Sequence, residues 1–223
     1  MVNAPLLYAL RMRLAAWTVT ILLASAGSAL AQQPQRLPLF AADVRGFSVG
    51  LKQDPITAND MGVLPEALPG RGLGGVVGVH LYPLRGRSMA LGVGAEMMIA
   101  RGRAQEEDTA TGAPVGLPIE QRLRSLSPQI SLNFGSGDGW SYVSAGMGRL
   151  SFETFRGETA PAAEPPTKST INMGGGARWF AKAHLAFCFD VRFYLTRPES
   201  GVGPFPGRER SRLLVMSAGV AFK

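Results

Sequence analysis

Residues 171–196 read INMGGGARWFAKAHLAFCFDVRFYLT, and this stretch decides the fold. Its second half, from Leu185 to Leu195, places a large apolar side chain at every second position. Its first half, from Ile171 to Trp179, alternates in the same way, and only residues 181–184 separate the two runs. Because a period of two is typical of a β-strand with two unlike faces, the stretch predicts a β-hairpin with a tight connection.

The second face of this hairpin carries charge, with Arg178, Asp190 and Arg192 between the apolar positions. A strand that faces lipid on one side and a narrow polar lumen on the other needs a long apolar line opposite polar residues. The hairpin therefore predicts part of a transmembrane β-barrel. The chain must then supply enough strands to close the barrel, because an open sheet edge is not tolerated in lipid.

The remaining sequence supplies six further alternating segments. They lie at residues 44–52, 73–82, 88–101, 126–134, 140–152 and 211–222. In the first of them, Phe47, Val49 and Leu51 share one face, and in the fifth either Tyr142 or Val143 could face lipid. Longer connections at 53–71, 102–122, 156–168 and 197–210 alternate with short turns. We therefore expect an all-β fold, an eight-stranded antiparallel up-and-down transmembrane β-barrel.

The N-terminus has the features of a secretory signal peptide. Two arginines precede an apolar run at 14–24, and small residues lead to a cleavage site after Ala31. Translation from Met1 and from Met12 are both compatible with this pattern. The expected organisation is a cleaved signal peptide at 1–31, a short leader at 32–43 and a barrel at 44–223. We expect the mature chain in the outer membrane of a Gram-negative bacterium.

Composition excludes several other classes of function. The net charge is +7, but the basic residues are scattered and form neither a stripe nor a recognition helix, so no nucleic-acid partner is expected. Cys188 is the single cysteine and cannot form an intramolecular disulfide. Since His80 and His184 are the two histidines, we expect no metal site, and the sequence indicates no cofactor and no catalytic residue.

Over about residues 44–223, the chain resembles the small outer-membrane barrels of the OmpA and OmpX type. The resemblance is carried by GGGARWF at 174–180, DVRFYLT at 190–196, MSAGVAFK at 216–223, the signal peptide and the rhythm of the connections. It implies a barrel surrounded by outer-membrane lipid and lipopolysaccharide. It also implies a terminal aromatic residue that the barrel-insertion machinery reads, and Phe222 fits this role, with Lys223 beyond it.

The polar faces of the expected strands define a candidate lumen network. The interior of an eight-stranded barrel is just wide enough to be filled by side chains, and charges inside it must be paired. The expected members are Glu96, Gln129, Asn133, Asn172, Arg178, Asp190, Arg192 and Tyr194. We interpret this network as structural, and a narrow passive channel is the alternative.

The expected function is non-enzymatic, a structural or surface-interaction role through extracellular loops whose ligand the sequence does not identify. A lipid-modifying barrel enzyme would need a Ser-His-acid group on the outer face near the external rim. His184 is instead expected in a turn, and His80 on the lumen side. A soluble lipocalin-like binding barrel would turn its apolar face inward. Aromatic residues next to predicted turns favour a membrane interface: Trp140, Tyr142, Trp179 and Phe180.

Overall fold

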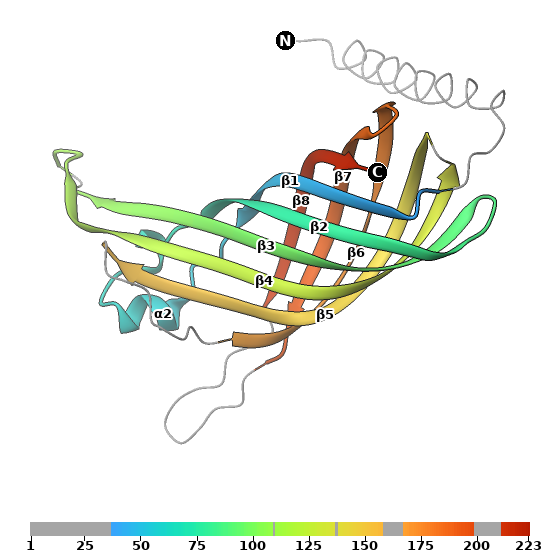
Figure 1. Cartoon of the computed structure of the whole chain (residues 1–223). Coiled ribbons are helices and arrows are strands. Elements are labelled where there is room, and N and C mark those ends of the chain that lie inside the picture. Colours follow the sequence, from blue (N-terminus) through green and yellow to red (C-terminus); the bar gives the residue numbers. More distant parts are fainter. Residues whose placement is uncertain (1–36, 109, 137, 158–166, 199–210) are drawn as a thin grey trace, which may run out of the picture. The chain divides into compact units, whose positions relative to one another are not determined.

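The computed structural model describes residues 37–108, 110–136, 138–157, 167–198 and 211–223. The expected signal peptide, both possible starts and residues 32–36 of the expected leader lie outside these residues. The strands are β1 (Phe40–Gly50), β2 (Arg71–Arg85), β3 (Met89–Glu107), β4 (Pro114–Ser136), β5 (Gly139–Arg156), β6 (Thr167–Lys182), β7 (Leu185–Thr196) and β8 (Arg212–Phe222). Each strand pairs antiparallel with its neighbours in sequence, and β1 pairs with β8 (Figure 1). The predicted up-and-down barrel of eight strands is confirmed.

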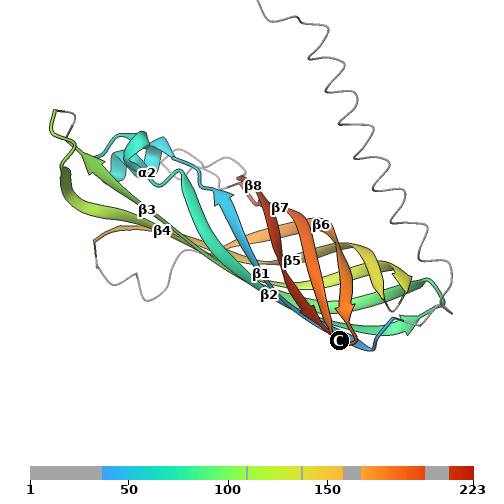
Figure 2. The same cartoon turned by 90° about the horizontal axis from the view of Figure 1, so that it is seen from above.

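The two ends of the barrel differ in their connections. The short turns β2–β3, β4–β5 and β6–β7 share one end, here called the turn end, with the start of β1 and the last residue of β8. The β1–β2 and β3–β4 connections lie at the opposite end, here called the loop end, where β5 and β7 end and β6 and β8 begin. Figure 2 shows the β1–β2 connection gathered at the loop end beside β3 and β4.

Several strand boundaries differ from the sequence prediction, most clearly in β1, β3 and β4. Strand β1 begins at Phe40 and not at 44, so the expected leader supplies its first residues. Strand β3 runs to Glu107 and β4 begins at Pro114, so most of the expected loop at 102–122 is a protruding hairpin. At its tip, Asp108 accepts hydrogen bonds from the backbone N–H groups of Thr111 and Ala110, which lower the pKa of this carboxyl. Near the tip, residues 113–117 are exposed. A segment with water on both faces needs no apolar alternation, which is why the pattern did not reveal this part of the hairpin.

The β1–β2 connection, predicted as a loop, contains the short helix α2 (Pro55–Asp60) and the 3₁₀ turn η2 (Pro65–Ala67). Asp54 caps α2 by accepting a hydrogen bond from the N–H of Thr57 at 3.2 Å. An acidic cap followed by proline is a typical helix start. Ala58 and Leu68 pack against Ile119 of β4. Within the described residues, the helices are too short to cross a membrane.

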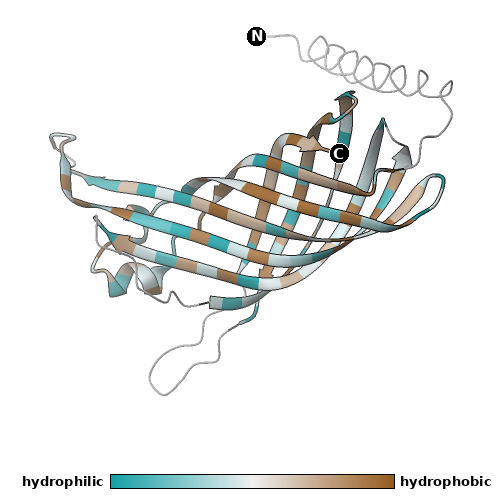
Figure 3. Ribbon diagram, viewed as in Figure 1, coloured by the Kyte–Doolittle hydropathy of each residue, from teal (hydrophilic) through white to brown (hydrophobic). Residues whose placement is uncertain are grey.

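Figure 3 shows hydrophobic and hydrophilic residues alternating along the strands. Large apolar side chains are exposed on all eight strands, whereas charged side chains such as Arg45, Glu96 and Asp190 are buried inside the barrel. We call the outward set the apolar belt; it includes Val44, Val79, Val93, Ile99, Leu126, Ile130, Val143, Met173, Phe189, Phe193, Leu214 and Met216. On β3 the belt runs from Met89 to Ile99, about 34 Å of strand at about 3.4 Å per residue. With a tilt of about 40°, this corresponds to a height of about 25 Å, which matches the apolar band of transmembrane barrels.

The structure shows which side chains of β1 and β5 face outward, which the alternating pattern alone did not determine. Phe47 and Val49 of β1 are buried in the lumen, because they share their face with charged residues nearer the turn end. On β5, Val143 faces outward, whereas Trp140 and Tyr142 are 3% and 4% exposed and point inward. The expectation that Trp140 and Tyr142 lie at the membrane interface is therefore wrong. Both side chains fill the lumen.

Candidate functional site

Three arginines and three carboxylates meet in the lumen. They are Asp43 and Arg45 of β1, Glu96 of β3, Arg178 of β6, and Asp190 and Arg192 of β7. Each of these residues is at most 3% exposed. Because isolated buried charges are strongly disfavoured, an equal number of both signs is what a desolvated layer requires. We call these six residues the ionic layer.

Arg45 lies at the centre of the ionic layer. Its Nε donates to Asp43 at 2.7 Å, its Nη2 donates to Glu96 at 2.5 Å, and its Nη1 lies 3.1 Å from Asp190. Ser217 of β8 accepts a further hydrogen bond at 3.3 Å. One guanidinium thus connects β1 with β3, β7 and β8 across the barrel.

Arg178 binds the same layer from β6. It donates to Asp43 at 2.6 Å and to the hydroxyl of Tyr82 at 3.2 Å. Its guanidinium also lies over the ring of Tyr142, 4.5 Å from the centroid. Gly176 on β6 leaves the space for that ring, since a Cβ there would lie 2.7 Å from the tyrosine oxygen.

Arg192 extends the layer into a polar network. Its Nη1 donates to Gln129 at 2.9 Å and to Asn172 at 2.8 Å. Its Nη2 donates to Ser144 at 2.7 Å and to Asp190 at 3.1 Å. Hydrogen bonds of a fork of this kind fix the side chain in one orientation.

All the predicted network residues except Asn133 lie in one connected group. Tyr194 belongs to it because its hydroxyl donates to Glu96 at 2.7 Å. The amide of Asn133 points into the lumen but donates to Ser131 and to the backbone carbonyl of Ala90. Sequence reasoning found the face of Asn133 but not its height in the barrel.

The predicted network left out Asp43, Arg45, His80, Tyr82 and Tyr142, although His80 was expected on the lumen side. For Asp43 and Arg45 the sequence did contain an indication. Asp43-x-Arg45 repeats the spacing of Asp190-x-Arg192, which places both side chains on one face of a strand. His80 is 2% exposed, with its Nε2 4.0 Å from Asp43. Asp43 was not considered because the first strand was expected to begin at residue 44, which assigned Asp43 to the leader.

Apolar clusters cover the ionic layer on both sides. Toward the loop end lie Phe47, Val49, Leu51, Val76, Met98, Ala100, Leu123, Leu150, Tyr194 and Val215. Toward the turn end lie Leu37, Ala41, Tyr82, Ala90, Trp140 and Tyr142, with Phe180 packed against them. Trp140 stacks on Phe180 with the ring centroids 5.1 Å apart. The lumen is thus filled by three layers, of which the middle one is charged.

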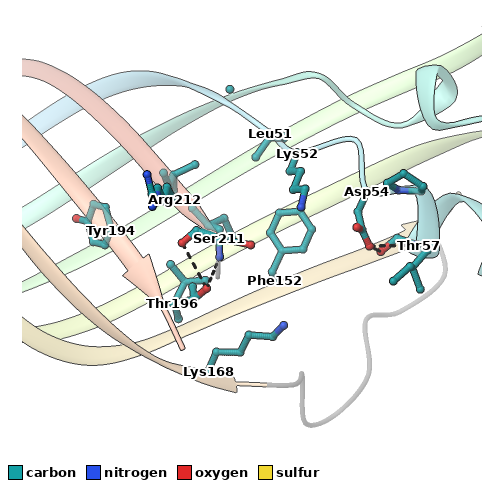
Figure 4. A pocket seen from close by; sticks show the side chains of 16 residues that line it. Leu51, Lys52, Asp54, Thr57, Phe152, Lys168, Tyr194, Thr196, Ser211 and Arg212 are labelled. Carbon is teal, nitrogen blue, oxygen red and sulfur yellow. Dashed lines mark hydrogen bonds between the residues drawn. The ribbon is translucent and has the colours of Figure 1, made fainter. Parts of the chain in front are cut away.

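The loop end holds a cavity of about 700 Å³, which we call the mouth (Figure 4). Its apolar lining includes Leu51, Leu123, Leu150, Phe152, Leu213, Pro55 and Ile56. Its charged lining consists of Lys52, Lys168 and Arg212 with Asp54. Figure 4 shows Phe152 between Lys52 and Lys168. The mouth therefore combines an apolar floor with a mainly cationic rim.

Arginines gather on the outer face just beyond the apolar belt, toward the loop end. We call Arg101, Arg103, Arg122, Arg124 and Arg149 the arginine cluster. Arg101 and Arg122 are paired in the β3–β4 register. Arg101 donates to Glu120, and this hydrogen bond lowers the pKa of that carboxyl. Glu153, paired with Arg122 on β5, is a second neighbouring acid, so positive charge stays in excess.

A closed ring with charges inside and apolar side chains outside reverses the arrangement of a soluble barrel. The chain has the fold of a small transmembrane β-barrel. No protein-family model and no curated sequence matches it.

The barrel is similar to several solved structures at low sequence identity. Neisserial surface protein A is 11% identical with a TM-score of 0.49, covering 82% of this chain and 96% of that one. The N-terminal barrel domain of OprF from Pseudomonas aeruginosa is 13% identical with a TM-score of 0.43, covering 85% and 98%. The attachment invasion locus protein Ail of Yersinia pestis, in complex with the heparin analogue sucrose octasulfate, is 10% identical with a TM-score of 0.44, covering 83% and 99%.

The remaining candidate residues lie at or near the turn end of the barrel. His184 lies in the β6–β7 turn, with its Nδ1 3.1 Å from the carbonyl oxygen of Lys223. Phe222 ends β8 and is 46% exposed on the outer face. Cys188 is buried and reduced. Among the described residues, no three His, Cys, Asp or Glu side chains come together as a metal site would require.

Proposed function

We propose that this chain is an outer-membrane protein of a Gram-negative bacterium with a non-enzymatic, structural or surface-interaction role. The observation that carries the proposal is the apolar belt, in which side chains such as Ile130 and Phe187 are 61% and 63% exposed. Exposed apolar surface of this extent is costly in water and stabilising in lipid. The barrel would be the anchor, and the loop end would be the working face outside the cell.

The filled lumen supports this proposal over the alternative of a passive channel. The ionic layer is desolvated and lies between two apolar clusters. An ion would have to displace side chains at all three levels. We therefore propose that the lumen network has a structural role, in which it holds the strands together.

The positions of the histidines favour a non-enzymatic role. His80 is enclosed in the lumen, and His184 lies at the turn end. A Ser-His-acid group that acts on outer-leaflet lipid would need a histidine on the outer face near the loop end. We also propose that the barrel-insertion machinery reads Phe222, because it ends the last strand and its ring faces outward.

The first test combines location with conductance. We expect the chain in the outer-membrane fraction, with a gel band whose mobility shifts on boiling, because a closed barrel stays folded in the unheated sample. In planar bilayers the purified protein should give no discrete current steps. Recovery in the soluble periplasmic fraction would overturn the membrane proposal, and regular current steps would overturn the sealed lumen.

The arginine cluster supports lipopolysaccharide as a lipid partner. It lies beyond the belt at the loop end, where the phosphate groups of outer-leaflet lipid would be, and guanidinium groups bind phosphate through paired hydrogen bonds. Cations placed side by side on neighbouring strands repel each other, so a bound polyanion would stabilise this face.

The triple variant R101Q/R124Q/R149Q should bind lipopolysaccharide about tenfold more weakly, because it removes three contacts to phosphate. Binding would be measured by titration in lipid nanodiscs at low and physiological salt. The matched control is R85Q/R87Q/K182Q, which removes the same charge at the turn end. Equal loss in both variants would mean that only net charge matters, which would contradict a specific site.

A further inference from the structure

The mouth has the build of a ligand pocket. Its volume of about 700 Å³ lies within the range of about 300–1,000 Å³ that is usual for small-molecule sites. Leu51, Leu123 and Leu150 belong to the buried apolar cluster, and Phe152 and Leu213 pack against it, so the floor is part of the core of the barrel. This floor offers contacts to an apolar chain and almost no hydrogen-bond donors.

The rim of the mouth provides the opposite chemistry. Lys52 follows the end of β1, and Lys168 lies on the lumen face of β6, paired with the buried Leu150 of β5. Arg212 starts β8 at the same rim, but its side chain shares the outer face of that strand with Leu214 and Met216. Asp54 is the acidic residue in the lining, and it caps α2, because its carboxylate accepts from the N–H and hydroxyl of Thr57 at 3.2 Å and 2.9 Å. Two lysines and one capped carboxylate leave the charge that faces the cavity net positive.

The base of the mouth is closed. Tyr194 lines the cavity with its ring, while its hydroxyl donates to Glu96 of the ionic layer. Thr196 and Ser211 seal the wall between β7 and β8 through their mutual hydrogen bonds (Figure 4). A ligand in the mouth would thus be held at the outer end and not passed through the barrel.

From an apolar floor, a cationic rim and a closed base, we infer that the mouth binds an amphiphilic anion, a single-chain fatty acid with its carboxylate at Lys52 and Lys168. The inference rests on the proposed function for the statement that the mouth opens outside the cell. The floor receives the alkyl chain, and the rim neutralises the head group. A neutral chain lacks the second contact, and a cationic amphiphile is repelled by the rim.

The probe is octanoate carrying fluorine at its terminal carbon, titrated with the full mature chain in nanodiscs and followed by fluorine NMR. Empty nanodiscs correct for partition into lipid. We expect line broadening that saturates, and competition by octanoate at about five- to tenfold lower concentration than by octanol. Octyltrimethylammonium should not compete.

The variant K52Q/K168Q should weaken binding of the probe about five- to tenfold, while the control R85Q/K182Q removes the same charge at the turn end and should leave binding unchanged. The gel shift on boiling verifies that both variants are folded. Equal competition by octanol, or no effect of K52Q/K168Q, would overturn recognition of the carboxylate. No broadening beyond that of empty nanodiscs would overturn the site itself, whereas outer-membrane fractionation tests the proposed function separately.

Discussion

Replacement of Arg45 by methionine should lower the free energy of unfolding of the barrel by about 3–5 kcal/mol. Arg45 is the shared partner of Asp43, Glu96 and Asp190. Without it, three buried carboxylates share two arginines, and the layer is left with an excess negative charge that water does not reach. Methionine keeps much of the side-chain volume, so the effect reports charge more than a cavity. Chemical unfolding in phospholipid vesicles would measure it.

A second substitution tests the electrostatic cause. In R45M/E96Q the two remaining arginines face two carboxylates, so the double variant should recover part of the lost stability. R85M at the turn end is the matched control, because Arg85 is exposed and its loss should cost no more than about 0.5 kcal/mol. If R45M unfolds like the unchanged chain, the ionic layer does not hold the barrel together.

The second large effect concerns the outer face. Ile130→Arg should destabilise the barrel in lipid vesicles by about 2–4 kcal/mol, because Ile130 lies in the middle of the belt, paired with Val93 and Ala145. Leu126→Arg should cost only about 0–1 kcal/mol, because Leu126 lies at the edge of the belt and is paired with Arg149.

These two variants form a matched pair, since each introduces the same charge on the same face of β4. Unfolding would be followed in vesicles of one lipid composition. Equal costs at both positions would contradict the orientation of the belt in the membrane. If neither substitution had a cost, the outer face would be in contact with water.

The sequence predicted the strands well because lipid imposes alternation on every segment that crosses it. Leu185 to Leu195 shows this most clearly, and β7 covers the same residues. Segments outside the lipid do not need this alternation of apolar and polar residues. For this reason the extension of β3 to Glu107 and the helix at Pro55 were not predicted, although the Asp54-Pro55 pair was an available signal.

The sequence predicted which residues of the candidate site face the lumen, but not how far along the barrel axis each one lies. Periodicity placed Glu96, Asp190 and Asn133 inside, but it contains no information on which inward residues share a level. The level depends on strand register, which sets Asn133 opposite Ala90, toward the turn end, and Glu96 opposite Ser127. Phe47 shows the converse problem, because an apolar residue in a small barrel serves equally well as lumen filling and as lipid contact.

The ionic layer also has a consequence for assembly. Its bonds join β1 to β6 through Asp43 and Arg178, and β1 to β7 through Arg45 and Asp190, so strands from both ends of the chain take part. A growing sheet that still lacks β6 and β7 cannot form these bonds, and its charges remain hydrated. The favourable electrostatic contacts arrive together when the ring shuts. We therefore expect closure to be a late, cooperative step in which the last water leaves the interior, with few stable half-built forms before it.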